Sequence, residues 1–474
     1  MRIYNTLSRK IEEFQPLNPL YVGMYSCGPT VYDYTHIGHL RKYVGDDILR
    51  RVLEVNKYKV KHVMNITDVG HLVSDGDLGE DKIEKGAREF GKTVWEVAKF
   101  YEEYFWKSVD TVNIKRPSIV AKVTDHIEEQ IRLIHKLEKN GFTYQTDQAV
   151  YFQIDKFPNY TKLSRQKLEE KKVGARIGVV VDKQKKNPHD FALWFFTVGH
   201  FKDHTMRWSS PWGQGFPGWH IECSAISMEY LGDCFDIHTG GIDHIPVHHT
   251  NEIAQSEAAT GKTFVKHWVH HNFLIVDGEK MSKSKKNFYR IDEMIEKGFD
   301  PLALRYLFLT VCYRDKLNFT FESLKSAQNA LDNLREIIRD WSFSDEASEG
   351  KELHGNYKKF MDSVNNDLNM PQALAVMWDM VKSDPLIGRT DYSISAKVKS
   401  ILEMDKILGL KLDEYLGKPL EIPRKIQRLL SQRNQARQSG DFKKSDEIRR
   451  EIKKSGFKIE DTLAGYKLKP ISDK

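Results

Sequence analysis

The N-terminal part of the chain has two short apolar runs with an amphipathic stretch between them. Residues 20–26 are apolar enough for a buried strand, and residues 60–66 resemble the next strand. Between them, apolar side chains recur at every fourth position, at Leu40, Val44, Ile48 and Val52. That spacing puts them on one face of a helix. Strand, helix and strand in this order predict a βαβ unit of a doubly wound parallel sheet, which binds ligands at the carboxyl ends of its strands.

The pattern changes twice further along the chain. Residues 111–200 break the rhythm and contain a hairpin-like segment near residues 148–154, so we expect an insertion there. From about residue 287 the pattern becomes helical. One apolar stripe with three- and four-residue steps is formed by Leu324, Ala327, Leu331, Leu334 and Ile338. This indicates a helical bundle, with a loop at residues 342–355, and two more helices flank the Ser439-Gly440 pair.

Together these changes predict an α/β fold in several parts. The first part is a Rossmann-type domain with a doubly wound parallel sheet, whose halves are residues 1–110 and 201–265, separated by the connective insertion at 111–200. A loop region at 266–310, a helical bundle at 311–418 and a small basic C-terminal domain at 419–474 follow.

Composition is that of a globular protein. The chain has 474 residues, of which 40% are hydrophobic, so it can bury a large core. No apolar run is long enough to cross a bilayer, and residues 1–6 lack the apolar core of a signal peptide, so we expect a cytoplasmic location. The four cysteines are too scattered for a disulfide framework. We therefore expect these cysteines to be reduced thiols or ligands of a metal.

Charge is unevenly distributed. The net charge is +6, but residues 421–474 hold 15 lysines and arginines against 8 acidic residues, a balance of +7. The first 420 residues therefore carry about −1. A basic tail suits a polyanion, although a solvated basic face without a partner has the same appearance.

Two short motifs carry candidate nucleotide chemistry. The first is Thr35-His36-Ile37-Gly38-His39, directly before the predicted helix, where a helix N-terminus and two imidazoles can meet phosphate charge. The second is Lys280-Met281-Ser282-Lys283-Ser284, preceded by a turn at Asp277-Gly278. Two lysines and two hydroxyls on a short loop can hold a triphosphate. Each motif alone fits an ordinary turn or surface loop, but the ordered pair on either side of an insertion is far more specific.

The pair resembles the two signatures of class I aminoacyl-tRNA synthetases. That resemblance implies adenylate chemistry, in which an amino-acid carboxylate attacks the α-phosphate of ATP, supplied with Mg²⁺. It implies that His36 and His39 contact the phosphates, with Gly38 allowing close backbone approach, and that Lys280 and Lys283 contact the leaving pyrophosphate.

A glycine stretch, His238-Thr239-Gly240-Gly241-Ile242-Asp243, is expected at the end of another strand. The same resemblance implies nucleotide contacts there, with Asp243 available to a ribose hydroxyl. By itself, a glycine pair indicates only a turn.

Four further residues form a candidate metal site. Cys27 follows the first predicted strand, and Cys223 lies in Trp219-His220-Ile221-Glu222-Cys223. His248 and Glu252 are four residues apart in a helix-compatible run, so both face one way. Two thiolates, an imidazole and a carboxylate are a plausible tetrahedral zinc set. Spacing leaves His249 open as the histidine ligand, since it lies three residues before Glu252, and it leaves open that the cysteines are ordinary core residues.

The surrounding sequence resembles cysteinyl-tRNA synthetases over nearly the whole chain. The likeness includes residues 3–7, Asn65-Ile66-Thr67-Asp68, the candidate metal residues, the lysine loop and residues 460–462. It implies one Zn²⁺ on Cys27, Cys223, His248 and Glu252 that ligates the thiolate of the substrate L-cysteine, in a pocket lined by Gly28, Thr67 and Trp219. A soft ion prefers a thiolate to a serine hydroxyl. The sequence departs from the family's usual pattern at Thr239, Val247 and Thr250, and none of these removes a ligand.

The resemblance also gives the C-terminal half a role. It implies that residues 266–310 include a tRNA stem-contacting region and that residues 419–474 bind the anticodon, so the expected partners are cysteine tRNA, ATP and L-cysteine, with no membrane or DNA. Two alternatives remain. A cysteine ligase of the mycothiol pathway resembles the core but lacks the tail, and a non-catalytic tRNA-binding paralogue or zinc scaffold would not need both complete signature motifs.

Overall fold

The computed structural model describes residues 1–69, 72–74, 78–166, 182–282, 287–341, 353, 355–383, 393–418, 420, 422–462 and 465–470. The chain divides into two compact units. The first unit comprises Met1–Phe288, Val311–Asn318 and Asp362–Met370, and the second comprises Tyr289–Thr310, Phe319–Met361 and Pro371–Lys474. Among the described residues, no helix is both long enough and apolar enough to cross a membrane.

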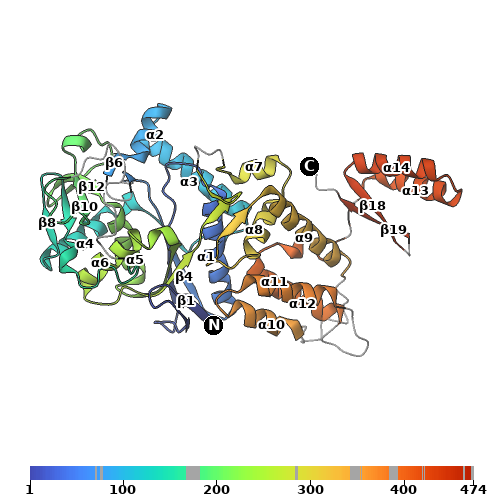
Figure 1. Cartoon of the computed structure of the whole chain (residues 1–474), viewed down its shortest axis with the longest axis horizontal. Coiled ribbons are helices and arrows are strands. Elements are labelled where there is room, and N and C mark those ends of the chain that lie inside the picture. Colours follow the sequence, from blue (N-terminus) through green and yellow to red (C-terminus); the bar gives the residue numbers. More distant parts are fainter. Residues whose placement is uncertain are drawn as a thin grey trace. The chain divides into compact units, whose positions relative to one another are not determined.

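A five-stranded parallel sheet forms the centre of the first unit (Figure 1). Its order is β14-β13-β3-β4-β7, with bounds Val265–His271, Phe235–Gly241, Val22–Ser26, Val60–Ile66 and Ile119–Lys122. Every neighbouring pair is parallel. Helix α1, Ile37–Val55, connects β3 to β4 and buries the apolar face predicted from its four-residue spacing. The predicted doubly wound fold is therefore confirmed.

Helices α4 (Ile127–Lys139), α5 (Trp219–Leu231) and α6 (His248–Thr260) also belong to this unit. Helix α6 buries most of its circumference, polar side chains included. A helix that is polar and yet buried needs partners for its polar groups, and it places them where a site can use them.

A second five-stranded sheet lies within the first unit and is antiparallel, with order β11-β12-β10-β9-β8. Its strands are Trp208–Ser210, Gly213–Pro217, Phe191–Phe196, Ala149–Phe152 and Thr143–Gln145. Strands β8 and β9 form the hairpin that the sequence predicts near residues 148–154. Aromatic and aliphatic side chains, including Phe152, Phe191 and Trp194, pack with residues of α4, α5 and α6 in one core.

The first unit also contains two further helices and several short strands. They are β1 (Arg2–Asn5), β2 (Lys10–Glu13), β5 (Leu72–Ser74), β6 (Leu78–Asp81), α2 (Lys82–Phe90), α3 (Val94–Thr111), β15 (Leu274–Val276), β16 (Glu279–Lys280) and β17 (Leu317–Phe319). Strands β15 and β16 pair through a tight turn at Asp277 and Gly278, whose φ angles are 50° and 81°. This is the turn predicted before the lysine loop.

Helices dominate the second unit. They are α7 (Ile291–Glu296), α8 (Pro301–Leu309), α9 (Phe321–Arg339), α10 (Gly355–Val364), α11 (Met370–Lys382) and α12 (Ile394–Leu408). All five residues of the predicted apolar stripe are buried on α9. The predicted loop at residues 342–355 falls almost wholly outside the described residues, as does Pro419.

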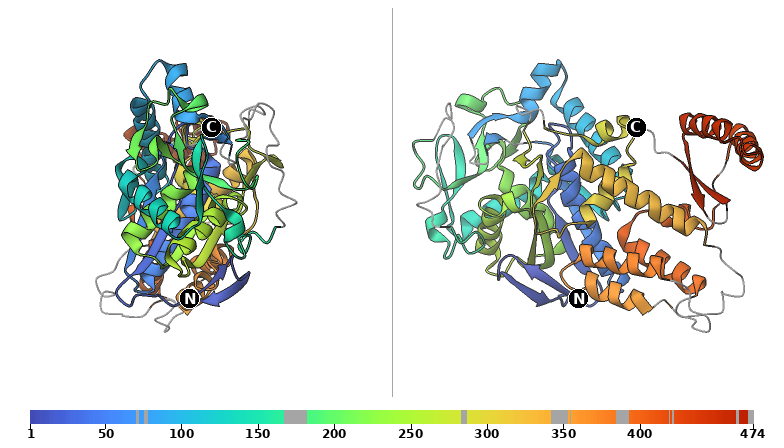
Figure 2. Two further views of the ribbon diagram at one scale, coloured as in Figure 1. Left: turned by 90° about the vertical axis from the view of Figure 1, so that its left-hand side faces the viewer. Right: turned by 45° about the vertical axis from the view of Figure 1, so that its right-hand side comes forward.

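The C-terminal part combines two helices with a hairpin (Figure 2). Helices α13 (Arg424–Gln438) and α14 (Phe442–Lys454) flank the predicted break, where Gly440 has a φ of 74°. Strands β18 (Phe457–Thr462) and β19 (Gly465–Pro470) pair antiparallel. The helical pattern expected from residue 287 onward was wrong here and at β17. The hairpin contributes Ile459 to a small core with Ile426, Leu429, Leu430, Ile448 and Ile452.

Candidate active site

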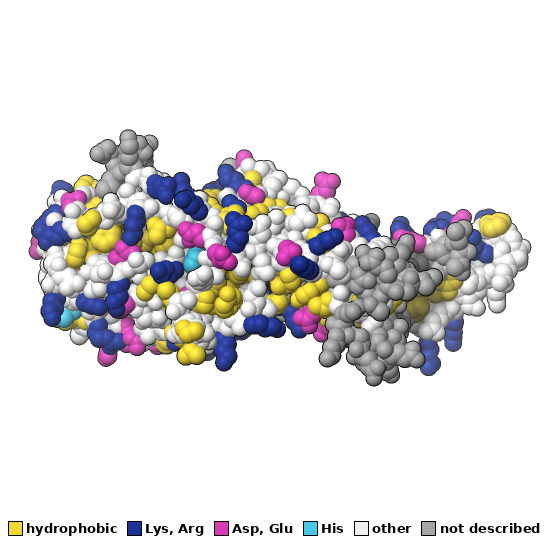
Figure 3. All heavy atoms as spheres, turned by 90° about the horizontal axis from the view of Figure 1, so that it is seen from below, with side chains coloured by type: hydrophobic (Ala, Val, Ile, Leu, Met, Phe, Trp, Pro, Cys, Tyr) yellow, Lys and Arg dark blue, Asp and Glu magenta, His cyan; other side chains and the backbone are white. Residues whose placement is uncertain are grey.

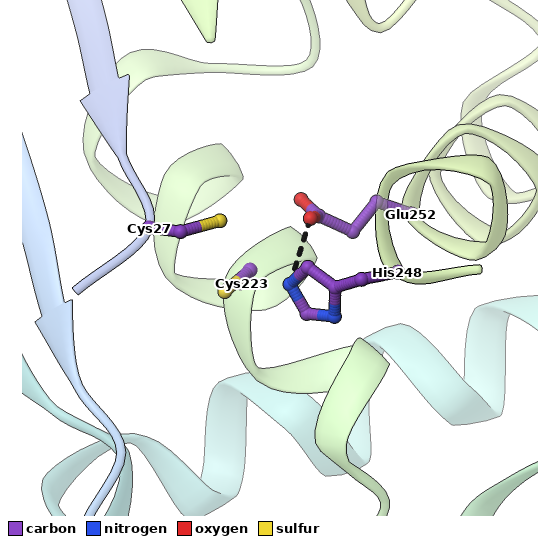
Figure 4. Close-up of side chains that lie close together, drawn as sticks. All are labelled: Cys27, Cys223, His248 and Glu252. Carbon is purple, nitrogen blue, oxygen red and sulfur yellow. Dashed lines mark ion pairs between the residues drawn. The ribbon is translucent and has the colours of Figure 1, made fainter. Parts of the chain in front are cut away.

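The structure brings the four candidate metal ligands together (Figure 4). Cys27, Cys223, His248 and Glu252 are buried, and each offers one ligand atom within 4.8 Å of those of the other three. In Figure 4 the side chains point toward one another. Residues far apart in the chain therefore form one cluster of two thiols, an imidazole and a carboxylate.

Local structure explains how three elements meet at this point. Cys27 directly follows β3, and the next residue, Gly28, lies so close to β4 that an added Cβ would be 1.6 Å from the carbonyl oxygen of Asn65. Gly218 precedes α5, and a Cβ there would be 2.1 Å from the carbonyl oxygen of Ala192. These glycines allow the strand end and the helix start to approach closely. On α6, four-residue spacing puts His248 and Glu252 on one face.

The donors fit a zinc ion. Zinc bonds to sulfur and nitrogen are about 2.0–2.3 Å long, which puts the ligand atoms of a tetrahedral site roughly 3–4 Å apart. His248 Nε2 lies 3.0 Å from Glu252 Oε1, so these two candidate ligand atoms are at about the spacing of a tetrahedral site. Burial raises the pKa of the Cys27 thiol and raises that of Cys223 further. Buried thiols held above their usual pKa become thiolates when a cation compensates the charge.

A second histidine set overlaps the first. Cys27, His238, His249 and Glu252 also place their ligand atoms within 4.8 Å of one another. His249 Nε2 lies 3.3 Å from Cys27 Sγ, but its Nδ1 lies 2.7 Å from His270 Nε2. Only the set with His248 contains both thiols, the donors that zinc favours over harder cations. His248 therefore remains our proposed ligand, and His238, 2.8 Å from Glu252 Oε2, is suited to orient the carboxylate.

The three residues implied for the amino-acid pocket border this cluster. The Trp219 ring stacks on His248 with centroids 4.2 Å apart. Thr67 is buried and donates a hydrogen bond of 2.9 Å to Glu222, the neighbour of Cys223. Gly28 adjoins Cys27 and donates its N–H to Asn65 Oδ1 at 2.8 Å.

The first signature motif forms the start of α1. His36 is the N-cap residue, and its Nδ1 accepts the N–H groups of Gly38 and His39 at 3.0 and 3.3 Å. A ring nitrogen that accepts two N–H groups carries no proton, so the proton of a neutral His36 lies on Nε2. The His36 and His39 rings stack at 3.6 Å. Although His39 borders solvent, desolvation by surrounding atoms lowers its pKa to about 4, which Asp243 and Asp33 offset only in part. His39 is thus a neutral hydrogen-bonding group near pH 7, and His36 presents its Nε2 side to a ligand.

The second motif lies against the first. A Cβ on Gly38 would come within 2.5 Å of the Met281 methyl group, so the glycine makes room for the lysine loop. Phe288, just beyond that loop, meets the His36 ring edge-on at 4.7 Å. Asn287 bonds to both Ser282 and the carbonyl of Lys280, at 2.8 and 3.3 Å.

The two lysines of this motif differ in what the structure describes. The Lys280 ammonium lies 5.4 Å from the centre of the Phe273 ring. Lys283 is outside the described residues.

The glycine stretch lies at the carboxyl end of β13, as expected. A Cβ on Gly240 would come within 2.4 Å of the His249 ring, and one on Gly241 would come within 2.2 Å of Asp243 Oδ1. Asp243 follows in a short 3₁₀ turn and acts on the pKa of His39. The stretch therefore adjoins both the histidine cluster and the start of α1.

The departures from the expected pattern have structural partners. Thr239 donates its hydroxyl to Ser26 at 3.0 Å, and its carbonyl accepts the Cys27 N–H at 3.3 Å. Val247 precedes α6, and Thr250 donates to the carbonyl of Ile245 at 2.7 Å. Sequence reasoning missed Lys42, which reaches the Cys27 carbonyl, and gave no role to His238. The only sequence signal for Lys42 was its four-residue spacing from Asp46 on a helix.

Comparison with known proteins gives the class. The model of the family described as "tRNA synthetases class I (C) catalytic domain" matches residues 13–329, and that of the DALR domain matches residues 359–413. The fold of a Mycobacterium tuberculosis methionyl-tRNA synthetase bound by methionyl-adenylate is similar, with a TM-score of 0.57 and 14% identity over 83% of this chain and 93% of that one. The protein is thus a class I tRNA synthetase.

Curated relatives give the particular family. Cysteine–tRNA ligase 1 of Burkholderia lata is 45% identical over 99% of this chain and 96% of its own length. Cysteine–tRNA ligase of Treponema denticola is 43% identical over 97% of this chain and 98% of its own length. The chain belongs to the cysteine–tRNA ligase family.

Proposed function

We propose that this enzyme activates L-cysteine with ATP and transfers it to the 3′ end of cysteine tRNA. The observation that carries the proposal is the cluster of Cys27, Cys223, His248 and Glu252, in the same unit as two signature motifs that touch each other. A ligase that selects cysteine needs a group that distinguishes a thiol from a hydroxyl. The naming of full-length relatives as cysteine–tRNA ligases supports the same substrate.

In the activation step, the cysteine carboxylate attacks the α-phosphate of ATP and pyrophosphate leaves, forming cysteinyl-adenylate and no covalent bond to the enzyme. His36 and His39 donate to the phosphates from the start of α1, where the helix dipole also favours negative charge. Lys280 and Lys283 neutralise the leaving pyrophosphate, whose charge Mg²⁺ shares. Gly38, Gly240 and Gly241 let the backbone approach the nucleotide, and Asp243 accepts a hydrogen bond from a ribose hydroxyl.

Cysteine selection belongs to the metal cluster and the residues beside it. When bound there, zinc supplies a soft Lewis acid with a preference for the substrate thiolate over a serine hydroxyl. Trp219 covers His248, and Thr67 and Gly28 border the remaining space. A site built for one polar group rejects an analogue that lacks it by roughly 10⁴–10⁵. Selection at this strength makes a separate editing domain unnecessary.

The helical and C-terminal regions would hold the tRNA. We assign stem contacts to residues 266–310, a helical bundle to 311–418 and anticodon binding to 419–474. On the face shown in Figure 3, lysine and arginine side chains are spread among acidic and apolar ones. Phosphate contacts by the 15 lysines and arginines of residues 421–474 would give an affinity for tRNA that weakens as salt rises.

The test is ATP–pyrophosphate exchange with the purified full-length chain, followed by charging of cysteine tRNA. Exchange should require cysteine, serine should support it far less, and charged tRNA should accumulate. Cysteine-dependent exchange with transfer to an amino sugar but not to tRNA would overturn the tRNA assignment. Absence of cysteine-dependent exchange from a zinc-loaded preparation would overturn the whole proposal.

A further inference from the structure

Helix α1 buries a chain of charged groups beside the proposed metal site. The Lys42 ammonium donates to the carbonyl oxygen of Cys27 at 2.7 Å and lies 2.8 Å from Asp46 Oδ2. Asp46 Oδ1 lies 2.9 Å from Nε2 of His271, the last residue of β14. The Lys42 side chain is 13% exposed, and those of Asp46 and His271 are each 2% exposed. These contacts therefore connect the backbone of Cys27, a proposed metal ligand, through two residues of α1 to the end of β14.

The Cys27 segment has three backbone anchors. Its own N–H bonds to the carbonyl of Thr239 on β13, and the Gly28 N–H bonds to Asn65 on β4. Both are bonds to strands that neighbour β3 in the sheet. Lys42 provides the third anchor. It connects the ligand segment to the helix that begins at His36 and His39.

The arrangement is costly for a group that only stabilises the fold. Taking an ammonium and a carboxylate out of water is unfavourable, and their mutual attraction often does no more than offset that cost. Burial raises the pKa of Asp46, but Lys42 and His271 more than reverse that effect, so the carboxylate stays charged. Gly45 leaves room for the His271 ring beside α1, because a Cβ at this position would lie 2.3 Å from Cε1 of His271.

We propose that Lys42 is a positioning residue for cysteine recognition: it fixes the Cys27 carbonyl, and with it the direction of Cys27 Sγ, relative to α1. Asp46 and His271 hold Lys42 in place. The inference rests on the proposed function, since it assigns Lys42 to the zinc–cysteine site rather than to the phosphates. Removing Lys42 should therefore weaken cysteine binding and metal retention more than ATP binding.

The same helix offers a matched control. Arg50 pairs with Glu54 four residues later at 2.8 Å, and it donates to the carbonyl of Arg116 at 2.6 Å. Its side chain is 14% exposed, nearly the value for Lys42. Arg50→Met thus removes the same kinds of contact from the same helix, away from the metal cluster.

The experiment compares Lys42→Met, Lys42→Arg and Arg50→Met in the full-length enzyme by exchange kinetics and by zinc retention against a chelator. Lys42→Met should raise the KM for cysteine about tenfold or more and weaken zinc retention by about 10–100-fold, the usual effect of losing a residue that orients a ligand. The KM for ATP should change less than about threefold. Lys42→Arg, which keeps a charged donor, should restore most of the cysteine KM, and Arg50→Met should change neither KM nor zinc retention.

Three results would overturn the proposal: an unchanged cysteine KM and zinc content in Lys42→Met, equal rises in both KM values, or an Arg50→Met variant that behaves as Lys42→Met does. If Lys42→Met does not fold, Asp46→Asn replaces it and should raise the KM for cysteine and weaken zinc retention while leaving the KM for ATP nearly unchanged; an unchanged cysteine KM would count equally against the proposal. If the wild-type enzyme itself lacks zinc and cysteine-dependent exchange, the proposed function fails with it. A normal wild type with a silent Lys42→Met refutes the positioning role alone.

Discussion

The metal cluster and the C-terminal helix–hairpin region place their polar groups in opposite ways. At the cluster, Cys27, Cys223, His248 and Glu252 are withdrawn from solvent and surrounded by further histidines. In the C-terminal region the buried residues are mostly aliphatic, and most charges lie on the surface. Buried polar groups cost folding free energy, so their concentration marks a place where chemistry requires them. In the C-terminal region, by contrast, a small aliphatic core supports a surface that carries the positive charge.

The two regions should therefore respond differently to change. A single substitution at the cluster should abolish one chemical capacity, because each donor has a distinct role. A single substitution in the C-terminal region should have a small effect, because the proposed contacts with tRNA phosphates would be divided among many surface charges. Removal of the entire region is needed for a large effect, and that effect should fall on tRNA rather than on cysteine activation.

The largest effect should follow from Cys223→Ser. We expect zinc content to fall from about one per chain toward zero and cysteine-dependent exchange to fall by more than roughly 1,000-fold, beyond the usual loss of a single preorganised donor. Cys234→Ser is the matched control, since Cys234 is outside both candidate ligand sets. Elemental analysis and exchange rates check both variants. Equal behaviour of the two serine variants would contradict the ligand assignment.

Lys283→Ala should have the second-largest effect on exchange. If Lys283 neutralises the leaving pyrophosphate, exchange should drop by about 100-fold or more while thermal unfolding stays unchanged. Lys262→Ala provides a control, because Lys262 is exposed and forms a surface ion pair with Asp233 at 2.7 Å. Near wild-type exchange by Lys283→Ala would show that the lysine loop is not the catalytic one.

A chain that ends at Gly417 tests whether cysteine activation and tRNA binding belong to different regions. It lacks the +7 tail and should retain cysteine-dependent exchange, while tRNA charging should fall by about 10–100-fold. Full-length binding to tRNA should weaken steeply from low to moderate salt, and truncation should reduce that slope. A changed anticodon should impair charging only by the full-length chain. Intact charging and anticodon discrimination after truncation would move tRNA reading to the helical bundle.

The smallest effect concerns Asp461, which pairs with buried Arg433 at 2.7 Å and with Arg437 at 3.1 Å. The hydrogen bond from Arg433 lowers the pKa of Asp461, and nearby arginine charges lower it further. The stabilisation is therefore complete above the unfolded aspartate pKa of about 3.9 and disappears as pH falls through the lower folded value. Since the carboxylate is 34% exposed, Asp461→Asn should destabilise this region by only about 1 kcal/mol or less.

Amide hydrogen exchange in α13 and α14 of the full chain measures that difference. The difference between Asp461→Asn and the wild type should be full at about pH 6 and should shrink as pH falls below the unfolded aspartate pKa of about 3.9. Asp446→Asn, a substitution on α14 outside this ion pair, should show no such pH dependence. A constant difference across the whole range would contradict the ionic origin of the effect.

Much of the fold follows from local patterns, and the exceptions are instructive. Regular spacing predicts α1, the strands on either side of it and the buried stripe of α9, because each pattern lies within one element. The hairpin of β18 and β19 was missed although Phe457 and Ile459, and Tyr466 and Leu468, alternate as strand residues do. The surrounding lysines and glutamates obscured an alternation only two residues long on each strand.

The candidate site was predictable where its residues have recognisable neighbours in sequence. The metal residues and both signature motifs were chosen in that way, and the structure brings the described ones together. The contact from Lys42 to Cys27 and the link from Asp46 to His271 join segments distant in sequence, so only the folded chain reveals them. The choice between His248 and His249 also needs the folded chain, because the spacing of each to Glu252 is compatible with one helix face.

The most direct test of the account is the ratio of cysteine to serine activation as a function of zinc content. The full-length chain would be depleted of metal, reloaded in steps and assayed by ATP–pyrophosphate exchange with each amino acid. Cysteine activation and the cysteine-to-serine ratio should rise together with bound zinc, and the ratio should reach roughly 10⁴ at about one zinc per chain. Full cysteine selectivity in the metal-free chain would contradict recognition through a metal–thiolate bond.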